Sequence, residues 1–275
     1  MQHTMKRGCD NAEDTRAFGA QNLFQALART GGTRHIVDMD ARSQDFESTS
    51  PQTSNFDNIN VWLFDLDNTL YPARCDLFAQ VDVLINRYVA DLLGLALDEA
   101  RVIQKGYFQR YGTTLRGLMI DHNVDPHHYM DFVHDIDLAP VDPAPELGAA
   151  LDRLPGRKLI FTNGSRQHAI NVSTKLGIAD RFEAIFDIAD SDFIPKPDPG
   201  PYRDLIARHA LEPARTVFFD DMDRNLAPAA ALGMTTVWVP GHADWSGDGA
   251  GAHVHHVAHD LLDFLNLTLE SLPVA

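Results

Sequence analysis

The sequence contains few cysteines, few basic residues and no long apolar run, and each shortage excludes a class of protein. Only two cysteines, Cys9 and Cys75, occur in 275 residues, so a disulfide framework is excluded and a reducing compartment is expected. The 23 lysines and arginines are outnumbered by 39 aspartates and glutamates, which gives a net charge of −16. This charge argues against a nucleic-acid polymer as partner, because such binding needs a basic surface. No apolar run approaches the roughly 18 to 20 residues of a membrane span.

The first 57 residues differ in character from the rest of the chain. Residues 48–55 are rich in Ser, Thr and Pro and predict a linker, and residues 18–29 predict a short helical patch. No apolar segment typical of a signal peptide occurs at the N-terminus, so we expect a cytoplasmic protein without a membrane partner. We predict that residues 1–57 form a flexible extension, and we assign them no function.

The most informative segment is Asp65-Leu-Asp-Asn-Thr69, which directly follows the apolar run 61–64. In an extended strand, residues i and i+2 point to the same side, so the carboxylates of Asp65 and Asp67 converge where the strand ends. Repulsion between close carboxylates favours one ionised and one protonated group. The ionised group can attack, and the protonated group can donate a proton to a leaving group. A purely structural Asp-rich turn is the alternative for this segment alone.

Three further apolar runs each lead to a polar cluster. They are 158–161 with Thr162, Asn163 and Gly164, 184–186 with Lys196, and 216–219 with Asp220 and Asp221. The first cluster offers a hydroxyl and backbone N–H groups to a phosphate, the lysine offers a positive charge, and paired carboxylates suit Mg²⁺. Taken singly, the first and third clusters could cap helices and the lysine could be a solvated loop charge. Four such clusters, each after a buried type of strand, favour a catalytic site.

A helical insert is predicted after the first apolar run. Apolar residues recur at spacings of three and four from Leu77 to Leu92 and stop at Gly94, as in an amphipathic helix. The block 74–144 contains no convincing strand, and the proline-rich segment 139–145 marks its end. Further helix starts are predicted at Asp98, running to Tyr111, at Thr113 or Thr114, and at Asp125-Pro126.

From residue 145 onward the chain alternates between helical and strand patterns. Helices are predicted near 146–154, 165–176, 200–210, before 233 and at 260–270, and strands near 158–161, 184–187, 216–219, 235–239 and His253–His256. Such alternation predicts an α/β fold, a Rossmann-like doubly wound parallel sheet with ligands at the carboxyl ends of its strands. We predict a catalytic core of residues 58–73 and 145–275, with a small all-helical cap, 74–144, inserted after the first strand.

The four clusters resemble motifs I to IV of the haloacid dehalogenase-like phosphohydrolase superfamily. The longer strings at 64–72, 111–118, 161–164 and 218–226 are similar to its pyrimidine 5′-nucleotidase branch. The resemblance extends over about residues 58–265. It implies a haloacid dehalogenase-like core and an Mg²⁺-dependent reaction that passes through an aspartyl-phosphate.

The resemblance also implies a role for each motif residue. Asp65 is expected to attack phosphorus, and Asp67 to protonate the departing oxygen and then activate water. Thr162 and the Asn163 N–H are expected to hold phosphate oxygens, while Lys196 screens Asp65 from the incoming anion.

The expected Mg²⁺ ligands come from the first and fourth motifs. The resemblance implies that Asp65 and Asp221 hold the ion, with Asp220 adjacent and the backbone carbonyl of Asp67 in contact with it. Asn225 stands where many relatives carry aspartate, so an outer-shell role is expected for it.

Substrate specificity is expected in the cap. Phe108 and Tyr111 can stack on a base, and Arg116 can bond a pyrimidine edge or the phosphate. Both aromatic residues lie at helical spacing, so a core position is the alternative for them. His168 follows the Thr162 turn and can approach the substrate, whereas the His253–His256 cluster lies far from every motif.

The function expected from these observations is hydrolysis of a small phosphorylated metabolite, a nucleoside 5′-monophosphate such as UMP or CMP, by a monomer or homodimer. A phosphatase of a sugar phosphate or phosphoglycolate would use the same core with another cap lining. A phosphomutase would have to retain a bisphosphorylated intermediate. A C–halogen hydrolase is disfavoured because it has no use for Asp67. A non-enzymatic binding module is disfavoured because every motif position is intact.

Overall fold

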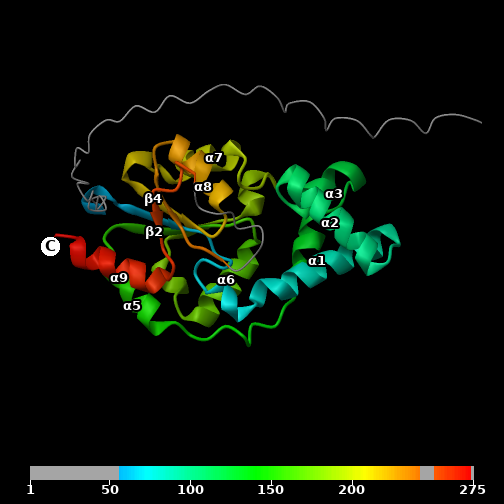
Figure 1. Ribbon diagram of the computed structural model, residues 1–275, viewed down its shortest axis with the longest axis horizontal. Helices are drawn as coiled ribbons and strands as arrows, with labels where there is room; N and C mark the ends of the chain where they lie inside the picture. The colour runs from blue at the N-terminus through cyan, green and yellow to red at the C-terminus, as the bar shows by residue number, and fades with distance from the viewer. Residues whose placement is uncertain (1–55, 242–250, 274–275) are drawn as a thin grey trace, which may run out of the picture. The chain divides into compact units, whose positions relative to one another are not determined.

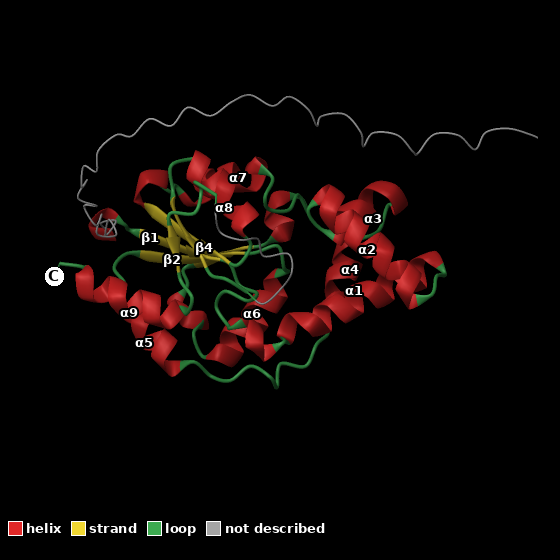
Figure 2. Cartoon of the chain, viewed as in Figure 1, coloured by secondary structure: helices red, strands yellow, loops and turns green. Residues whose placement is uncertain are grey.

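The computed structural model describes residues 56–241 and 251–273, and a six-stranded parallel sheet lies at the centre of this part (Figures 1 and 2). The strands are β1 Val61–Phe64, β2 Arg157–Phe161, β3 Ala184–Phe186, β4 Thr216–Asp220, β5 Thr235–Trp238 and β6 His256–Val257. Their order is β3-β2-β1-β4-β5-β6, and every neighbouring pair is parallel. The predicted doubly wound α/β fold is confirmed. Of the extension predicted at residues 1–57, all but Phe56 and Asp57 lie outside the described residues, as do the predicted linker and helical patch. Phe56 is buried in the core, in a short 3₁₀ helix.

Helices cover both faces of the sheet, because alternate residues of each strand point to opposite sides. Trp62 and Phe64 pack in one apolar cluster, and Val61 and Leu63 pack in another on the opposite face. The first cluster includes residues of α5 Pro145–Arg153, α6 Arg166–Leu176 and α9 Leu261–Ser271. The second includes residues of α7 Pro199–His209 and α8 Asp223–Ala231 (Figure 1). These helices match the predicted ranges within a few residues.

The segment between β1 and α5 is helical, as predicted, and we call residues 74–144 the cap. Its helices are α1 Leu77–Leu93, α2 Leu97–Tyr111, α3 Thr114–His122 and α4 Pro126–Val133. They bury their own apolar cluster, which includes Val89, Leu118 and Tyr129. Short 3₁₀ helices occur at Phe56–Asn58, Ala73–Cys75, Ala179–Arg181, Ile188–Ser191 and Pro213–Arg215. The exact division into extension, core and cap stays a prediction.

Most of the predicted ends of the cap helices are confirmed, but one is wrong. Gly94 ends α1 in the left-handed conformation at φ 66°, and the Thr113 hydroxyl caps α3 by accepting a hydrogen bond from the Arg116 N–H. Asp98 does not cap α2, because the helix begins one residue earlier, at Leu97. The Glu99 carboxylate instead accepts a hydrogen bond from the Ala96 N–H. Asp98 therefore lies in the first turn, where its negative charge interacts favourably with the helix dipole and stabilises the helix.

The edge strand predicted at His253–His256 is displaced toward the C-terminus. Only His256 and Val257 pair with β5. The Thr236 side chain holds the preceding residues, since its hydroxyl donates to the His253 carbonyl and accepts from the His255 N–H. These side-chain bonds replace the backbone ladder there. Within the described residues, no helix is long and apolar enough to span a bilayer.

Two glycines with positive φ offer a matched test of how the turn before β2 is built. Gly156 has φ +81°, and a Cβ atom there would lie 2.2 Å from the Asn60 carbonyl oxygen, beside the start of β1. Gly177 has φ +75°, but no heavy atom lies within 4 Å of its Cβ position.

We expect Gly177→Ala to lower the free energy of unfolding by about 1–2 kcal/mol, the cost of a left-handed non-glycine residue. Gly156→Ala adds a backbone clash and should cost roughly 3 kcal/mol or more. Urea denaturation of both variants measures the difference. Equal losses would contradict the close approach of Gly156 to Asn60.

Candidate active site

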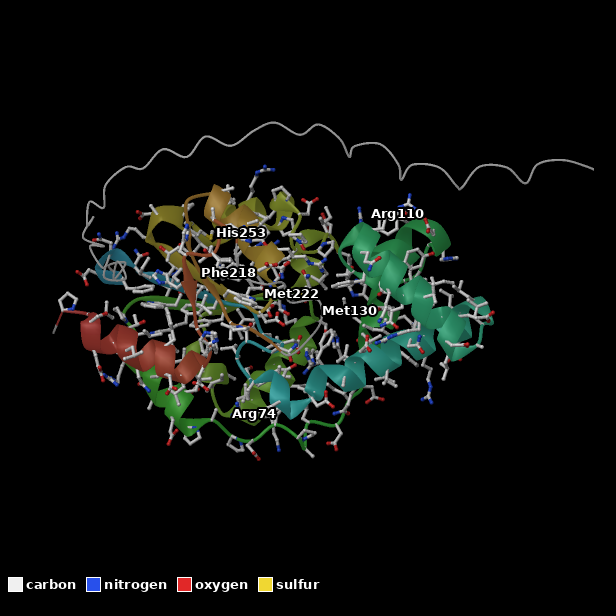
Figure 3. The ribbon with its side chains drawn as sticks, viewed as in Figure 1. Arg74, Arg110, Met130, Phe218, Met222 and His253 are labelled. Carbon is white, nitrogen blue, oxygen red and sulfur yellow. The ribbon has the colours of Figure 1, made fainter. Side chains whose placement is uncertain are left out.

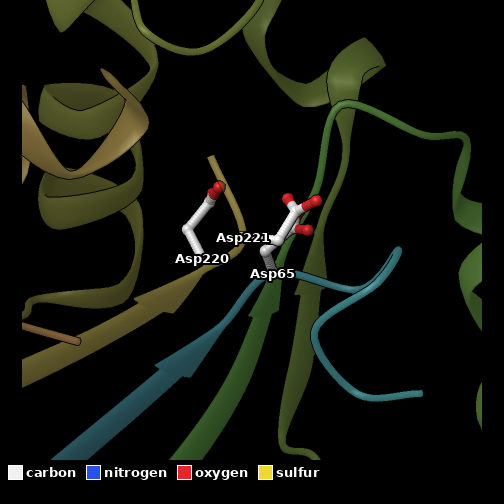
Figure 4. A group of neighbouring side chains, drawn as sticks. All are labelled: Asp65, Asp220 and Asp221. Carbon is white, nitrogen blue, oxygen red and sulfur yellow. The ribbon is translucent and has the colours of Figure 1, made fainter. Parts of the chain in front are cut away.

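The four polar clusters meet at the carboxyl edge of the sheet. β1 lies between β2 and β4, so the chain order reverses at β1, and this is where doubly wound sheets leave a crevice for ligands. Asp65 follows β1, while Asp220 ends β4 and Asp221 comes next (Figure 4). All three are buried, and one carboxylate oxygen from each lies within 4.8 Å of the others. The site thus brings together residues that are more than 150 positions apart.

Lys196 lies at the centre of this cluster and is only 1% exposed. Its Nζ donates to Asp65 Oδ1 at 2.8 Å, to Asp220 Oδ2 at 2.7 Å and to the Phe161 carbonyl at 2.9 Å. These three bonds use all three ammonium protons. Burial lowers the pKa of Lys196, but the two carboxylates outweigh burial and raise it above its ordinary value. The alternative of a solvated loop lysine is therefore wrong.

The turn after β2 holds the lysine loop in place. The Asn163 side chain accepts a hydrogen bond from the Lys196 N–H at 2.8 Å and donates to the Lys196 carbonyl at 3.3 Å. Thr162 Oγ1 accepts from the Gly164 N–H at 2.9 Å, which leaves its own hydroxyl proton available. Ser165 caps α6 by accepting from the His168 N–H. Capping is therefore not the role of Thr162 and Asn163.

The turn after β4 is fixed by Asp220. Its Oδ1 accepts from the Met222 N–H and from the Asn225 side-chain amide, each at 2.9 Å. The N-cap position of α8 is Met222, which makes no side-chain capping bond. The capping alternative for the aspartate pair is therefore wrong, and Asp220 is held by three donors in all.

Asp67 faces different partners from Asp65. Its Oδ1 accepts from the Tyr71 hydroxyl at 2.7 Å and from His168 Nε2 at 2.8 Å. Burial alone would raise the pKa of Asp67, but the charge of His168 and these two hydrogen bonds lower it to about 2. Burial lowers the pKa of His168, and Asp67 raises it by more, to above its ordinary value. Tyr71 was not singled out in the sequence, although it lies only four residues after Asp67.

The pKa of Asp65 moves in the opposite direction. Burial raises it from 3.8 to about 7, since the repulsion from Asp220 and Asp67 offsets part of the attraction from Lys196. Burial and the repulsion from Asp220 and Asp65 also raise the pKa of Asp221 well above its usual range. The two carboxyls of the first motif are thus unlike, as expected, but Asp67 is the more acidic one. The expected order of protonation is reversed because His168 and Tyr71 face Asp67 alone.

The excess of carboxylates over positive charge in this cluster suits a bound cation. Three buried carboxylates share one lysine, and hard oxygen donors of this kind suit Mg²⁺. Asn225 Oδ1 also lines the pocket, and within the described residues it is a buried oxygen with no hydrogen-bond partner. The Asp67 side chain is outside this cluster of carboxylates, because Tyr71 and His168 hold it.

A pocket extends from these carboxylates into the cap, and Met222 and Met130 line it from the two sides (Figure 3). Phe108 lines this pocket, but Tyr111 and Arg116 are not among the described residues that line it. The sequence reasoning missed Arg224 and Gln104, which do line it. The cap wall is largely apolar and includes Phe78, Val81, Ile85, Leu115, Tyr129, Met130 and Val133.

A second missed residue is His134, at the end of α4 in the cap. Its ring stacks on His168 with a centroid separation of 4.2 Å and an interplanar angle of 11°. His134 Nδ1 also forms a 3.0 Å hydrogen bond with the Ser165 hydroxyl. Burial and the neighbouring His168 lower the pKa of His134 to about 3. The cap thus packs a neutral imidazole against the partner of Asp67.

Comparison with solved structures confirms this fold. A haloacid dehalogenase-like (HAD) phosphatase from Thermococcus onnurineus matches with a TM-score of 0.53 at 20% identity, over 78% of this chain and all of that one. The hydrolase YfnB from Bacillus subtilis, in a magnesium-bound form, matches with a TM-score of 0.50 at 15% identity. That match covers 76% of this chain and 98% of YfnB.

Sequence comparison gives partial matches to curated proteins. Phosphate metabolism protein 8 of Saccharomyces cerevisiae is 31% identical over 190 residues, which cover 63% of this chain and 59% of that protein. Enolase-phosphatase E1 of Frankia alni is 36% identical over 86 residues, 30% of this chain and 36% of that protein. The chain thus matches less than two thirds of the length of either relative. The family model for haloacid dehalogenase-like hydrolases matches residues 59–233. The chain belongs to the haloacid dehalogenase-like hydrolase family.

Proposed function

We propose that the protein is an Mg²⁺-dependent phosphatase that hydrolyses nucleoside 5′-monophosphates, preferably those of pyrimidines, through an aspartyl-phosphate. The observation that carries the proposal is the buried Asp65–Lys196–Asp220 cluster, with Asp221 and Asp67 beside it. Two relatives carry names that refer to phosphate metabolism and to a phosphatase, which supports this chemistry. We further propose a small soluble enzyme of the cytoplasm, with the core and cap divided as the sequence predicts.

Asp65 is the nucleophile in this proposal. Its carboxylate attacks phosphorus, the bond from phosphorus to the ester oxygen breaks, and an aspartyl-phosphate forms. Lys196 holds Asp65 Oδ1 through a 2.8 Å hydrogen bond and favours the ionised form of the carboxylate. Since Asp220 and the Phe161 carbonyl fix the same ammonium group, the nucleophile is oriented before substrate arrives.

The turn after β2 binds the transferring phosphoryl group. Thr162 is buried and lines the pocket, and its hydroxyl proton is free because Oγ1 accepts from Gly164. This hydroxyl and the Asn163 N–H donate to phosphate oxygens. A side chain at Gly164 would be crowded, since a Cβ atom there would lie 3.3 Å from both Thr162 Oγ1 and His168 Cδ2. The glycine therefore keeps the turn open to substrate.

Asp67 is the acid and later the base. With a pKa near 2 it is ionised in the resting site, and the proton it needs lies next to it on His168 Nε2, 2.8 Å away. The negative charge of an incoming phosphate raises the proton affinity of Asp67 and favours transfer of that proton to Oδ1. Asp67 then protonates the departing ester oxygen and afterwards takes a proton from the water that attacks the aspartyl-phosphate.

Asp65, Asp220 and Asp221 would hold Mg²⁺, together with the Asp67 backbone carbonyl and with Asn225 at the outer shell. When bound, the ion neutralises charge on the phosphoryl oxygens. The residues of the chain position the substrate and move the protons.

Two observations support the proposed nucleotide preference, a sequence resemblance in the core and the lining of the cap. The strings at 64–72 and 218–226 resemble the pyrimidine 5′-nucleotidase branch, and the apolar cap wall suits the flat face of a base. The same wall would also accept other apolar leaving groups. A different small phosphorylated metabolite is therefore the competing substrate class, and a substrate panel separates the two.

We expect Mg²⁺-dependent release of phosphate from UMP, CMP and dTMP to exceed release from AMP, GMP and sugar phosphates. Asp65→Asn should lower turnover by about a thousandfold or more, because no covalent intermediate can form. Asp98→Asn, which alters an exposed carboxylate outside the pocket, is the control and should behave like the wild type. A flat or sugar-directed profile would contradict the nucleotide preference while leaving the phosphatase chemistry in place.

The role of Asp67 predicts a dependence on the leaving group. Asp67→Asn should slow hydrolysis of UMP about a hundredfold or more, since its sugar alkoxide is a poor leaving group that needs a proton. Hydrolysis of p-nitrophenyl phosphate should fall far less, because p-nitrophenolate leaves without one. The ratio is measured by comparing kcat/KM on both substrates, because kcat/KM reports the steps up to departure of the leaving group and not the later attack of water. Equal losses of kcat/KM would exclude Asp67 as the general acid.

The raised pKa of Asp65 predicts how metal and pH affect stability. A carboxyl whose folded-state pKa is about 7 rather than 3.8 stabilises the fold at low pH, and this contribution is lost as pH rises through 7. Mg²⁺ binds the ionised carboxylates, so it should raise the melting temperature more at pH 8 than at pH 5.5.

Thermal denaturation in EDTA and in Mg²⁺ at both pH values tests this expectation. Asp221→Asn removes one carboxylate of the cluster and should abolish most of the Mg²⁺ effect. An equal effect of Mg²⁺ at the two pH values would show that Asp65 does not titrate in this range.

A further inference from the structure

Arg224 is a cation at the boundary between the core and the cap. It belongs to the first turn of α8, three residues after Asp221. Its guanidinium carbon lies 4.3 Å from the centre of the Phe108 ring in α2, and its Nη2 donates to the Gly112 carbonyl at 3.4 Å. Among the cation–π contacts of the described residues, this is the only one that joins the core to the cap.

Most of the hydrogen-bond donors of the Arg224 guanidinium have no acceptor within the described residues. It carries five N–H protons, and the long bond to Gly112 is its one hydrogen bond within the described residues. Its Nε is buried there and has no hydrogen-bond partner. A buried donor left without a partner costs free energy, which a ligand that supplies an acceptor recovers. Arg224 lines the active-site pocket, so a bound substrate can supply that acceptor.

The other cations of the pocket are not available in the same way. Lys196 uses its three protons on Asp65, Asp220 and the Phe161 carbonyl. Lys105 lines the pocket but is exposed to solvent, where a lysine charge is well hydrated. Of these basic side chains, Arg224 alone combines a buried unpaired donor with a position on the pocket wall.

The leaving group is a better partner for Arg224 than the phosphoryl group is. Thr162, Asn163 and Lys196 already surround the phosphoryl end, whereas the cap wall is largely apolar. An apolar wall binds a flat ring but gives it no fixed orientation, which a few well-placed polar groups must supply. The planar fork of an arginine suits a carbonyl oxygen at the edge of such a ring.

We propose that Arg224 is a specificity-determining residue that donates hydrogen bonds to a carbonyl oxygen on the leaving group. The enzyme thereby selects phosphate monoesters whose leaving group bears a planar ring with a carbonyl, such as a pyrimidine nucleoside. This inference rests on the proposed phosphatase function and deepens it. The guanidinium lies over one face of the Phe108 ring, so that face of Phe108 is not free to stack on a base. The arginine that recognises the base then comes from the core, in place of the Arg116 expected from the cap.

The test compares UMP with phenyl phosphate, whose leaving group is planar but has no carbonyl. We expect Arg224→Met to lower kcat/KM about tenfold more for UMP than for phenyl phosphate, mainly through KM, as the loss of one charged hydrogen bond requires. Arg224→Lys keeps the positive charge but not the planar guanidinium, and it should also lower kcat/KM selectively for UMP. Arg110→Met is the matched control. Arg110 is exposed, stacks on Tyr111 in the same helix and does not line the pocket, so both substrates should be unaffected.

The comparison separates the inference from the proposed function. Equal losses on the two substrates would overturn the inference, because they would show that Arg224 acts on the phosphoryl group or only holds the cap. If the wild type released no phosphate from either compound, the proposed function would fail. Equilibrium binding would then decide the inference. The change in Kd between the wild-type and Arg224→Met proteins would be compared for UMP and for phenyl phosphate. A selective loss of UMP affinity supports it, and an equal change overturns it.

Discussion

The site depends on one buried ammonium group. Lys196 is placed between the carboxylates that end β1 and β4, and it is the only lysine or arginine bonded to both Asp65 and Asp220 within the described residues. Removing one partner from a buried charge pair costs about 3–5 kcal/mol, because the remaining charge is left without compensation. In the proposed mechanism the lysine therefore links catalysis to folding. Its loop is held by the Asn163 side chain, and Gly112 of the cap packs on Pro195 beside it, so the core and the cap both bear on its position.

The strongly acidic composition of the chain makes the positive charge of Lys196 important for binding an anion. In a chain with a net charge of −16, an anionic substrate gains nothing from the general field of the protein, so attraction must be built locally. Lys196 neutralises part of the carboxylate cluster, and the raised pKa values of Asp65 and Asp221 show that it does not neutralise all of it. A divalent ion would complete the neutralisation. The excess of carboxylates over lysine is thus the feature that supports a metal ion and a phosphate in the proposed function.

The sequence predicts the core of this site well, because the core depends on short-range patterns. Each buried strand is an apolar run, and parallel strands bring their carboxyl ends to one edge, so the residues that follow Phe64, Phe161 and Phe219 had to meet. The contacts of Asp67 are different. The sequence indicates only that His168 can approach the substrate, and it gives no sign that Tyr71 bonds Asp67. Their effect on the Asp67 pKa arises from three-dimensional packing that no spacing rule expresses.

The lining of the cap was the least predictable part, since it depends on how four helices rest on the sheet. Helical spacing places Phe108 and Tyr111 on neighbouring turns of α2, and Arg116 lies in α3, but the sequence does not say which of the three faces the core. Of these three, only Phe108 lines the pocket. Among the contacts between cap and core are those of Arg224 with Phe108 and of His134 with His168, and each pairs a cap residue with a residue at the carboxyl edge of the sheet. In the proposed mechanism the leaving group binds where these contacts meet the apolar wall. The cap would then cover the partner of the general acid and hold the arginine that recognises the substrate, so that recognition and proton transfer would depend on the same interface.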